Sequence, residues 1–97
     1  MPKLSQADAE KRIAHLKGWT LVGDAIRKAY TFKGFPEAIA FVNRLVPGAE
    51  AADHHPDIAI NFKRVTLTSS THSEGGLTVK DFDGAAAADR LALSHAP

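Results

Sequence analysis

The sequence predicts an α+β domain in which a four-stranded antiparallel sheet carries its helices on one face. Two observations support this prediction. Apolar residues recur at helical spacing in three segments, and they alternate with polar residues in four shorter segments rich in strand-forming residues. The order along the chain is α-β-β-α-β-β-α. With 97 residues and no repeats or linkers, we expect a single domain over residues 1–97.

The first helix is expected to begin after Ser5 and to end before Gly18. Serine followed three residues later by an acid is typical of a helix N-cap, and glycine is typical of a helix stop. A hairpin follows, in which Gly23-Asp24 forms the turn between two segments of alternating apolar residues. These apolar residues are Trp19, Leu21, Ile26, Tyr30 and Phe32.

The second helix is expected to start near Phe35-Pro36-Glu37, because proline and an acid favour the first turn of a helix. Phe41, Val42 and Leu45 continue an apolar stripe along it. Pro47-Gly48 lies inside this stripe, and both residues disfavour helix. We therefore expect a kink or a break just before Glu50.

The second hairpin is expected to turn at Lys63-Arg64, between two segments of alternating apolar residues. In that register the numbers of paired residues sum to 127, so that Phe62 faces Val65 and Ile60 faces Leu67. Both pairs are apolar, which supports the register. The last helix is expected to begin after Thr78 and to end near His95.

The segment from Glu50 to Asp57 concentrates two of the five histidines of the chain beside three acids, and the chain has no cysteine. Histidine exchanges protons near neutral pH, because its unperturbed pKa is about 6.5. Extending the predicted hairpin ladder places His55 opposite His72. Pro56 cannot donate to a ladder, so the backbone here is expected to leave regular strand geometry, which allows His54 to join the same cluster.

Three interpretations of this cluster are open from the residues alone. The histidines can belong to a polar loop, they can bind a metal ion, or they can act as general acids and bases with carboxylates to orient them. The motif for metal binding is weak because the HExxH spacing is missing. Residue type makes His54, His55, His72, Glu50 and Asp81 the candidates for acid-base chemistry, although Asp81 can instead cap its helix. The residues expected to lie outside the catalytic set are Trp19, His15, His95 and Asp57.

The chain resembles the pterin-4a-carbinolamine dehydratases. Their signature is an acid, three residues, His-His-Pro, then an aromatic residue, a histidine and an aspartate at fixed intervals. Here these are Glu50, His54-His55-Pro56, Phe62, His72 and Asp81, and Gly18-Trp19, Phe32 and Leu77-Thr78 fit as well. The resemblance covers nearly the whole chain.

The resemblance implies dehydration of a 4a-hydroxytetrahydropterin to the quinonoid dihydropterin during pterin recycling, without a metal or a bound cofactor. It implies that His54 and His72 are candidates for proton transfer to the departing hydroxyl and that His55 binds or deprotonates the pterin. Asp81 would orient His72, and Glu50 would support the site. The remaining implied pterin-binding residues are Asp53, Ser70, Thr71 and Ser73.

Composition limits the other partners. Lys and Arg total 12 against 11 acids, a net charge of +1, which gives no reason to expect binding to nucleic acid or to a membrane. The start of the chain lacks an apolar run typical of a signal peptide, and a cytoplasmic location is expected. The resemblance also implies a homodimer or homotetramer, and it leaves one alternative function open. Some animal relatives act as dimerisation coactivators of transcription, which would make the chain a protein-binding module.

Overall fold

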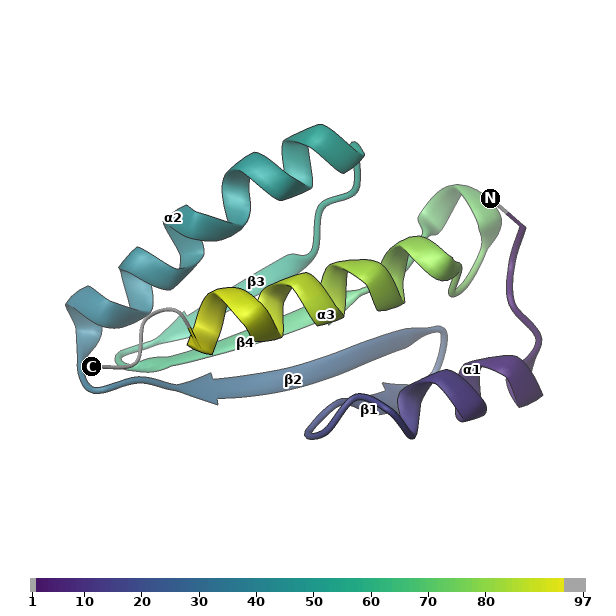
Figure 1. Ribbon diagram of the computed structural model, residues 1–97, viewed down its shortest axis with the longest axis horizontal. Coiled ribbons are helices and arrows are strands. Elements are labelled where there is room, and N and C mark those ends of the chain that lie inside the picture. Colours follow the sequence, from purple (N-terminus) through teal and green to yellow (C-terminus); the bar gives the residue numbers. More distant parts are fainter. Residues whose placement is uncertain (1, 94–97) are drawn as a thin grey trace.

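The computed structural model describes residues 2–93. It contains helices α1 (Gln6–Ile13), α2 (Phe35–Ala52) and α3 (Val79–Leu93), a 3₁₀ turn η1 (His72–Glu74), and strands β1 (Thr20–Val22), β2 (Ala25–Thr31), β3 (Asp57–Asn61) and β4 (Arg64–Ser69). The strands form one antiparallel sheet in the order β1-β2-β4-β3. This confirms the predicted α+β fold and the order of its elements (Figure 1).

The core lies between the sheet and the two long helices, which run in opposite directions across it (Figure 1). Alternate residues of the two central strands point into it, including Ile26 and Tyr30 from β2 and Val65 and Leu67 from β4, all buried. This alternation is what a sheet covered on one face requires. Among the described residues, no helix is both long enough and apolar enough to cross a membrane.

Helix α1 starts where the sequence predicts and ends earlier. The Ser5 hydroxyl accepts a hydrogen bond from the Asp8 backbone N–H at 3.1 Å, which confirms the N-cap. The helix ends at Ile13 rather than near Gly18. The next residues form tighter i to i−3 bonds, from His15 N–H to Arg12 and from Leu16 N–H to Ile13, as chains commonly do at a helix end.

The predicted break in α2 is wrong. The helix runs without interruption from Phe35 to Ala52 through Pro47 (Figure 1). A proline inside a helix costs a hydrogen bond to the carbonyl four residues earlier. Here that carbonyl belongs to Asn43, and both Asn43 and Pro47 are exposed, so water can satisfy it. Glu50 therefore stays on the last turn of a continuous helix.

The apolar stripe of α2 packs inward. Phe41 is fully buried, Leu45 is nearly so, and Val42 is half-buried against the core. The stripe of Phe41, Val42 and Leu45 therefore belongs to the core. The exposed large apolar residues of this helix are Phe35 and Val46.

The predicted register of the second hairpin is wrong by two residues. Ile60 pairs with Val65 and Ile58 with Leu67, so paired numbers sum to 125 rather than 127. The turn lies at Phe62-Lys63, and Phe62 has a positive φ of 56°, a geometry that tight hairpin turns require. The ladder ends at Asp57 and Thr68. His55 and His72 are consequently not cross-strand partners.

Helix α3 begins at Val79, directly after Thr78, as predicted. The Thr78 hydroxyl accepts from the Lys80 N–H at 3.2 Å, and the Asp81 carboxylate accepts from the Thr78 N–H at 2.9 Å. Thr78 is thus the N-cap of α3, and the bond from the Thr78 N–H to Asp81 shows that Asp81 also caps the helix. His95 lies outside the described residues, and α3 is described to Leu93.

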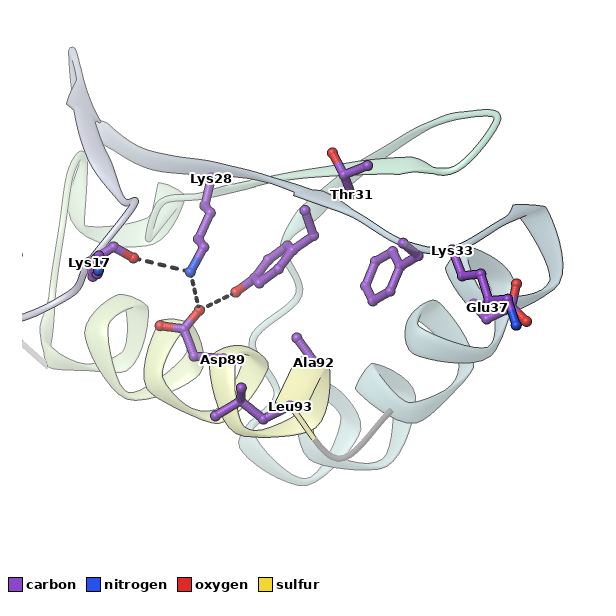
Figure 2. A pocket seen from close by; sticks show the side chains of 10 residues that line it. Lys17, Lys28, Thr31, Lys33, Glu37, Asp89, Ala92 and Leu93 are labelled. Carbon is purple, nitrogen blue, oxygen red and sulfur yellow. Dashed lines mark hydrogen bonds and ion pairs between the residues drawn. The ribbon is translucent and has the colours of Figure 1, made fainter. Parts of the chain in front are cut away.

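A polar network around Asp89 ties α3 to the first hairpin (Figure 2). The Asp89 carboxylate accepts from Trp19 Nε1 at 3.1 Å, from Lys28 Nζ at 2.9 Å and from the Tyr30 hydroxyl. Lys28 also donates to the Lys17 carbonyl at 3.0 Å. A cavity of about 700 Å³ opens beside this network. Lys28, Tyr30 and Asp89 bond to one another as Figure 2 shows, and so they hold α3 against the first hairpin.

Stability should fall at alkaline pH because of Tyr30. Burial, reinforced by the Asp89 carboxylate, raises the pKa of Tyr30 far above its usual value. The folded protein therefore keeps a phenolic proton that the unfolded chain loses above a pH of about 10. Above that pH the free energy of unfolding should decrease by up to about 1.4 kcal/mol per pH unit through this group. Urea denaturation of the wild type and of Tyr30→Phe from pH 8 to 11 measures this decrease in the free energy of unfolding. Equal slopes for the two proteins would contradict the assignment.

Candidate active site

The centre of the candidate site is an ion pair between His54 and Asp81. His54 Nε2 lies 2.6 Å from Asp81 Oδ1. His54 follows α2 and Asp81 lies in the first turn of α3, two ends that the antiparallel arrangement of the helices brings together (Figure 1). The Asp81 side chain is fully buried, and 12% of the His54 side chain is exposed. One imidazole is therefore fixed at the edge of the core.

Asp81 is saturated with hydrogen bonds. Besides the Thr78 N–H, it accepts from the Ser69 hydroxyl at 2.7 Å and from the Thr71 hydroxyl at 2.8 Å. A carboxylate only accepts, so Nε2 of His54 carries the proton between the two groups. This arrangement leaves Nδ1 of His54 as the nitrogen available to a substrate.

A second pair lies next to the first and is exposed. His55 Nε2 lies 2.5 Å from Glu50 Oε2, with 54% of the imidazole side chain and 68% of the glutamate side chain exposed. Between the two residues, Asp53 ends α2 in the left-handed conformation with φ of 50°. By the same argument as for His54, the carboxylate fixes the proton on Nε2 of His55 and leaves Nδ1 available.

The other sequence-predicted residues of the site differ in exposure. Thr71 is buried in the Asp81 network and Ser70 is half-buried, whereas Asp53, His72 and Ser73 are exposed. His72 begins η1, one residue after Thr71. Asp81 bonds to His54 and not to His72, so the expected orientation of His72 by Asp81 is not found.

Ser69 and Lys80 belong to the site although the sequence did not indicate them. Ser69 is the last residue of β4, points into the core and binds Asp81. Lys80 Nζ donates to the Ala52 carbonyl at 3.3 Å and so joins α3 to the end of α2. The alternation along β4 could have indicated Ser69, because it continues the inward-facing series of Val65 and Leu67.

A cavity of about 230 Å³ opens beside His54, between α2, α3 and the sheet. Its lining includes the polar residues His54, Ser69, Lys80 and Asp83, and is otherwise mostly alanine, glycine and leucine. It is smaller than the cavity beside Asp89, but it is the one that the ion pair of His54 and Asp81 adjoins. The imidazole that Asp81 orients therefore forms part of the wall of this cavity.

Metal ligation was one of the interpretations that the sequence left open. Over residues 2–93, no three His, Asp or Glu side chains converge as the ligands of a metal ion would. The two histidines are instead each bonded to a separate carboxylate. The arrangement suits proton transfer by two imidazoles, each with one fixed nitrogen and one available nitrogen.

The sequence of this chain matches a known protein family. Residues 2–91 match the family described as "Pterin 4 alpha carbinolamine dehydratase". A protein of Thermosynechococcus vestitus named "Putative pterin-4-alpha-carbinolamine dehydratase" is 50% identical over 94% of this chain and 96% of its own length. A protein of the same name from Sulfolobus acidocaldarius is 41% identical over 84% of this chain and 89% of its own.

Solved structures agree with this match. The transcriptional coactivator/pterin dehydratase of Brucella melitensis superposes with a TM-score of 0.89, at 33% identity over 93% of this chain and 98% of its own. A pterin dehydratase-like protein identified as a RuBisCO assembly factor in the alpha-carboxysome shares the fold, with a TM-score of 0.64 at 23% identity over 76% of this chain and 86% of its own. The sequence match over nearly the whole chain and the shared fold together show that the chain belongs to the pterin-4-alpha-carbinolamine dehydratase family.

Proposed function

We propose that this chain dehydrates 4a-hydroxytetrahydropterins to quinonoid dihydropterins in pterin recycling, in the cytoplasm. The observation that carries the proposal is the 2.6 Å pair between His54 and Asp81 beside a cavity. Family membership supports the substrate class. The reaction needs an acid for a departing hydroxyl and a base for a neighbouring N–H, and the site has two oriented imidazoles.

In this proposal His54 is the acid. The hydroxyl on C4a takes a proton from Nδ1 of His54 and leaves as water. The positive charge that His54 carries beforehand is stabilised by the buried carboxylate of Asp81, which accepts from Nε2. Because Asp81 is itself held by Ser69, Thr71 and the Thr78 N–H, the acceptor that orients the imidazole is fixed.

His55 is the base in the same proposal. As the C4a–O bond breaks, the ring nitrogen N5 loses its proton to Nδ1 of His55, and the electron pair of the N–H bond forms the new C=N bond. Glu50 accepts from Nε2 of His55 and stabilises the resulting imidazolium. Water and the quinonoid dihydropterin are the products, and exchange with solvent returns both histidines to their starting states. His72 is the alternative acid, and Asp53, Ser70, Thr71 and Ser73 complete the pterin site.

The test follows the loss of synthetic pterin-4a-carbinolamine by absorbance, with and without the protein. We expect the protein to accelerate the loss, and we expect a metal chelator to leave the accelerated rate unchanged, because the proposed steps use no metal ion. Loss of activity with chelator would contradict the metal-free mechanism. Absence of any acceleration would favour the binding module, the function that the name of the Brucella melitensis structure also includes.

We further propose that the chain forms a homodimer or homotetramer. β3 is an edge strand whose five residues are all exposed. Its apolar side chains Ile58 and Ile60 are 41% and 38% exposed, and Phe62 in the adjoining turn is 68% exposed. An exposed apolar edge strand is a template for pairing with another strand, and a second copy of this chain supplies one. A monomeric mass by light scattering at micromolar concentration would count against this proposal.

A further inference from the structure

The cavity beside His54 is kept open by small residues on two helices. Gly48 and Ala49 line it from α2, and Gly84, Ala87 and Ala88 line it from α3. Larger residues close it elsewhere, among them Trp19, Leu45 and Leu91. The helices that flank the cavity are also the two that carry His54 and Asp81 to their meeting point.

Two of these small residues are glycines that the fold does not require. Neither Gly48 nor Gly84 has a positive φ, both are exposed, and a Cβ added at either position would meet no atom within 4 Å beyond its chain neighbours and the backbone of its own helix. Glycine inside a helix costs about 1 kcal/mol relative to alanine. Helix geometry and close packing therefore do not require glycine at either position, and the protein itself leaves the space beside them unfilled.

The lining of the cavity indicates which part of a pterin fits. The pyrimidine half of a pterin carries an amino group, a carbonyl and ring N–H groups, and burying such groups without partners costs about 1–3 kcal/mol each. That half is favoured outside the cavity, where Glu50, Asp53 and His72 are exposed. The carbon C6 lies on the other half, two bonds from C4a, so a substituent on C6 can enter the apolar cavity while C4a stays at His54.

The volume of the cavity also agrees with binding of the C6 substituent alone rather than of the whole pterin. Pockets that enclose whole drug-sized ligands measure about 300–1,000 Å³, and this cavity measures about 230 Å³. It therefore suits a part of a ligand. Building on the proposed dehydratase function, we infer that the cavity between α2 and α3 is a specificity site for a short apolar substituent on C6 of the pterin.

The test compares two carbinolamines, one with a propyl group on C6 and one with hydrogen there. Each buried methylene contributes about 0.8 kcal/mol, or about fourfold. We expect the wild type to prefer the propyl substrate by about tenfold or more in kcat/KM. Gly84→Leu places a large side chain at the wall of the cavity and should abolish this preference. Gly48→Leu should act in the same way.

Two further variants distinguish a blocked cavity from a protein whose fold is damaged. Arg90→Leu adds a leucine to an exposed position of α3 that does not line the cavity, and it should keep the preference for propyl. Gly84→Ala should raise the melting temperature, because alanine favours helix. A wild type without preference for propyl, or a Gly84→Leu variant that retains it, would overturn the specificity site alone. A wild type that converts neither carbinolamine would overturn the dehydratase function and the specificity site together.

Discussion

Replacing His54 with alanine is expected to lower kcat for carbinolamine dehydration by about two to four orders of magnitude, the contribution typical of a general acid or base. Nδ1 of His54 is the proposed proton donor to the departing hydroxyl, and the variant lacks this donor. Initial rates of carbinolamine loss at saturating substrate, measured for wild type and His54→Ala, give the ratio. A variant with the wild-type rate would contradict the assignment.

Two other histidines provide controls for this result. His15 is exposed and lies beyond the end of α1, so His15→Ala should keep the wild-type rate. His55 is half exposed and bonded to an exposed glutamate, and such pairs contribute about 0–1 kcal/mol to stability. His55→Ala should therefore lower the rate and leave the thermal unfolding temperature nearly unchanged. A rate loss in all three variants would indicate a general defect rather than a loss of proton transfer.

Replacing Asp81 with alanine is expected to lower both activity and stability. The substitution removes a fully buried carboxylate and leaves four donors without their acceptor, from His54, Ser69, Thr71 and the Thr78 backbone. Breaking a buried ion pair costs about 3–5 kcal/mol, a large share of the roughly 5–15 kcal/mol that stabilises a small domain. Urea denaturation of the wild type and Asp81→Ala measures this difference.

Asp83→Ala is the matched control for stability. Asp83 lies in the same helix, half a turn beyond Asp81, and is exposed. Its removal should change the free energy of unfolding by less than about 0.5 kcal/mol, as surface substitutions generally do. Equal and small losses for Asp81→Ala and Asp83→Ala would show that the buried network is not an important source of stability.

The elements of the fold could be predicted because their signals are local. The cap at Ser5 and the cap at Thr78 are each contained within four residues, and both are found as predicted. The sequence does not predict a helix through Pro47, because proline has a low helix propensity. The exposure that makes this proline tolerable depends on how α2 packs against the rest of the protein, which no local pattern indicates.

The register of the second hairpin could not be derived from the apolar pattern. A shift of one residue would turn every side chain to the other face, but a shift of two preserves the faces. Ile60 therefore meets an apolar partner in both registers, Leu67 in the predicted one and Val65 in the observed one. The positive φ at Phe62 decides between them, and a large aromatic residue gives no sequence signal for that conformation.

The residues of the site were indicated by type and spacing, but their partners were not. Nothing in the sequence states which histidine meets Asp81, because that contact joins residues 27 positions apart and depends on how α2 and α3 pack. The same holds for Asp89, which contacts Trp19 across a separation of 70 positions in the sequence. The sequence alone gives no sign that Asp89 differs from an ordinary exposed helix residue.

Rescue of His54→Ala by added imidazole tests the central claim most directly, because it asks whether the lost group is a proton-transferring imidazole. Truncation of His54 enlarges a cavity that this side chain lines, so free imidazole has a place to bind. The account predicts that imidazole raises the rate of His54→Ala in a saturable manner and leaves the rate of the wild type unchanged. An unrescued variant, or one that already dehydrates the carbinolamine as fast as the wild type, would contradict the account.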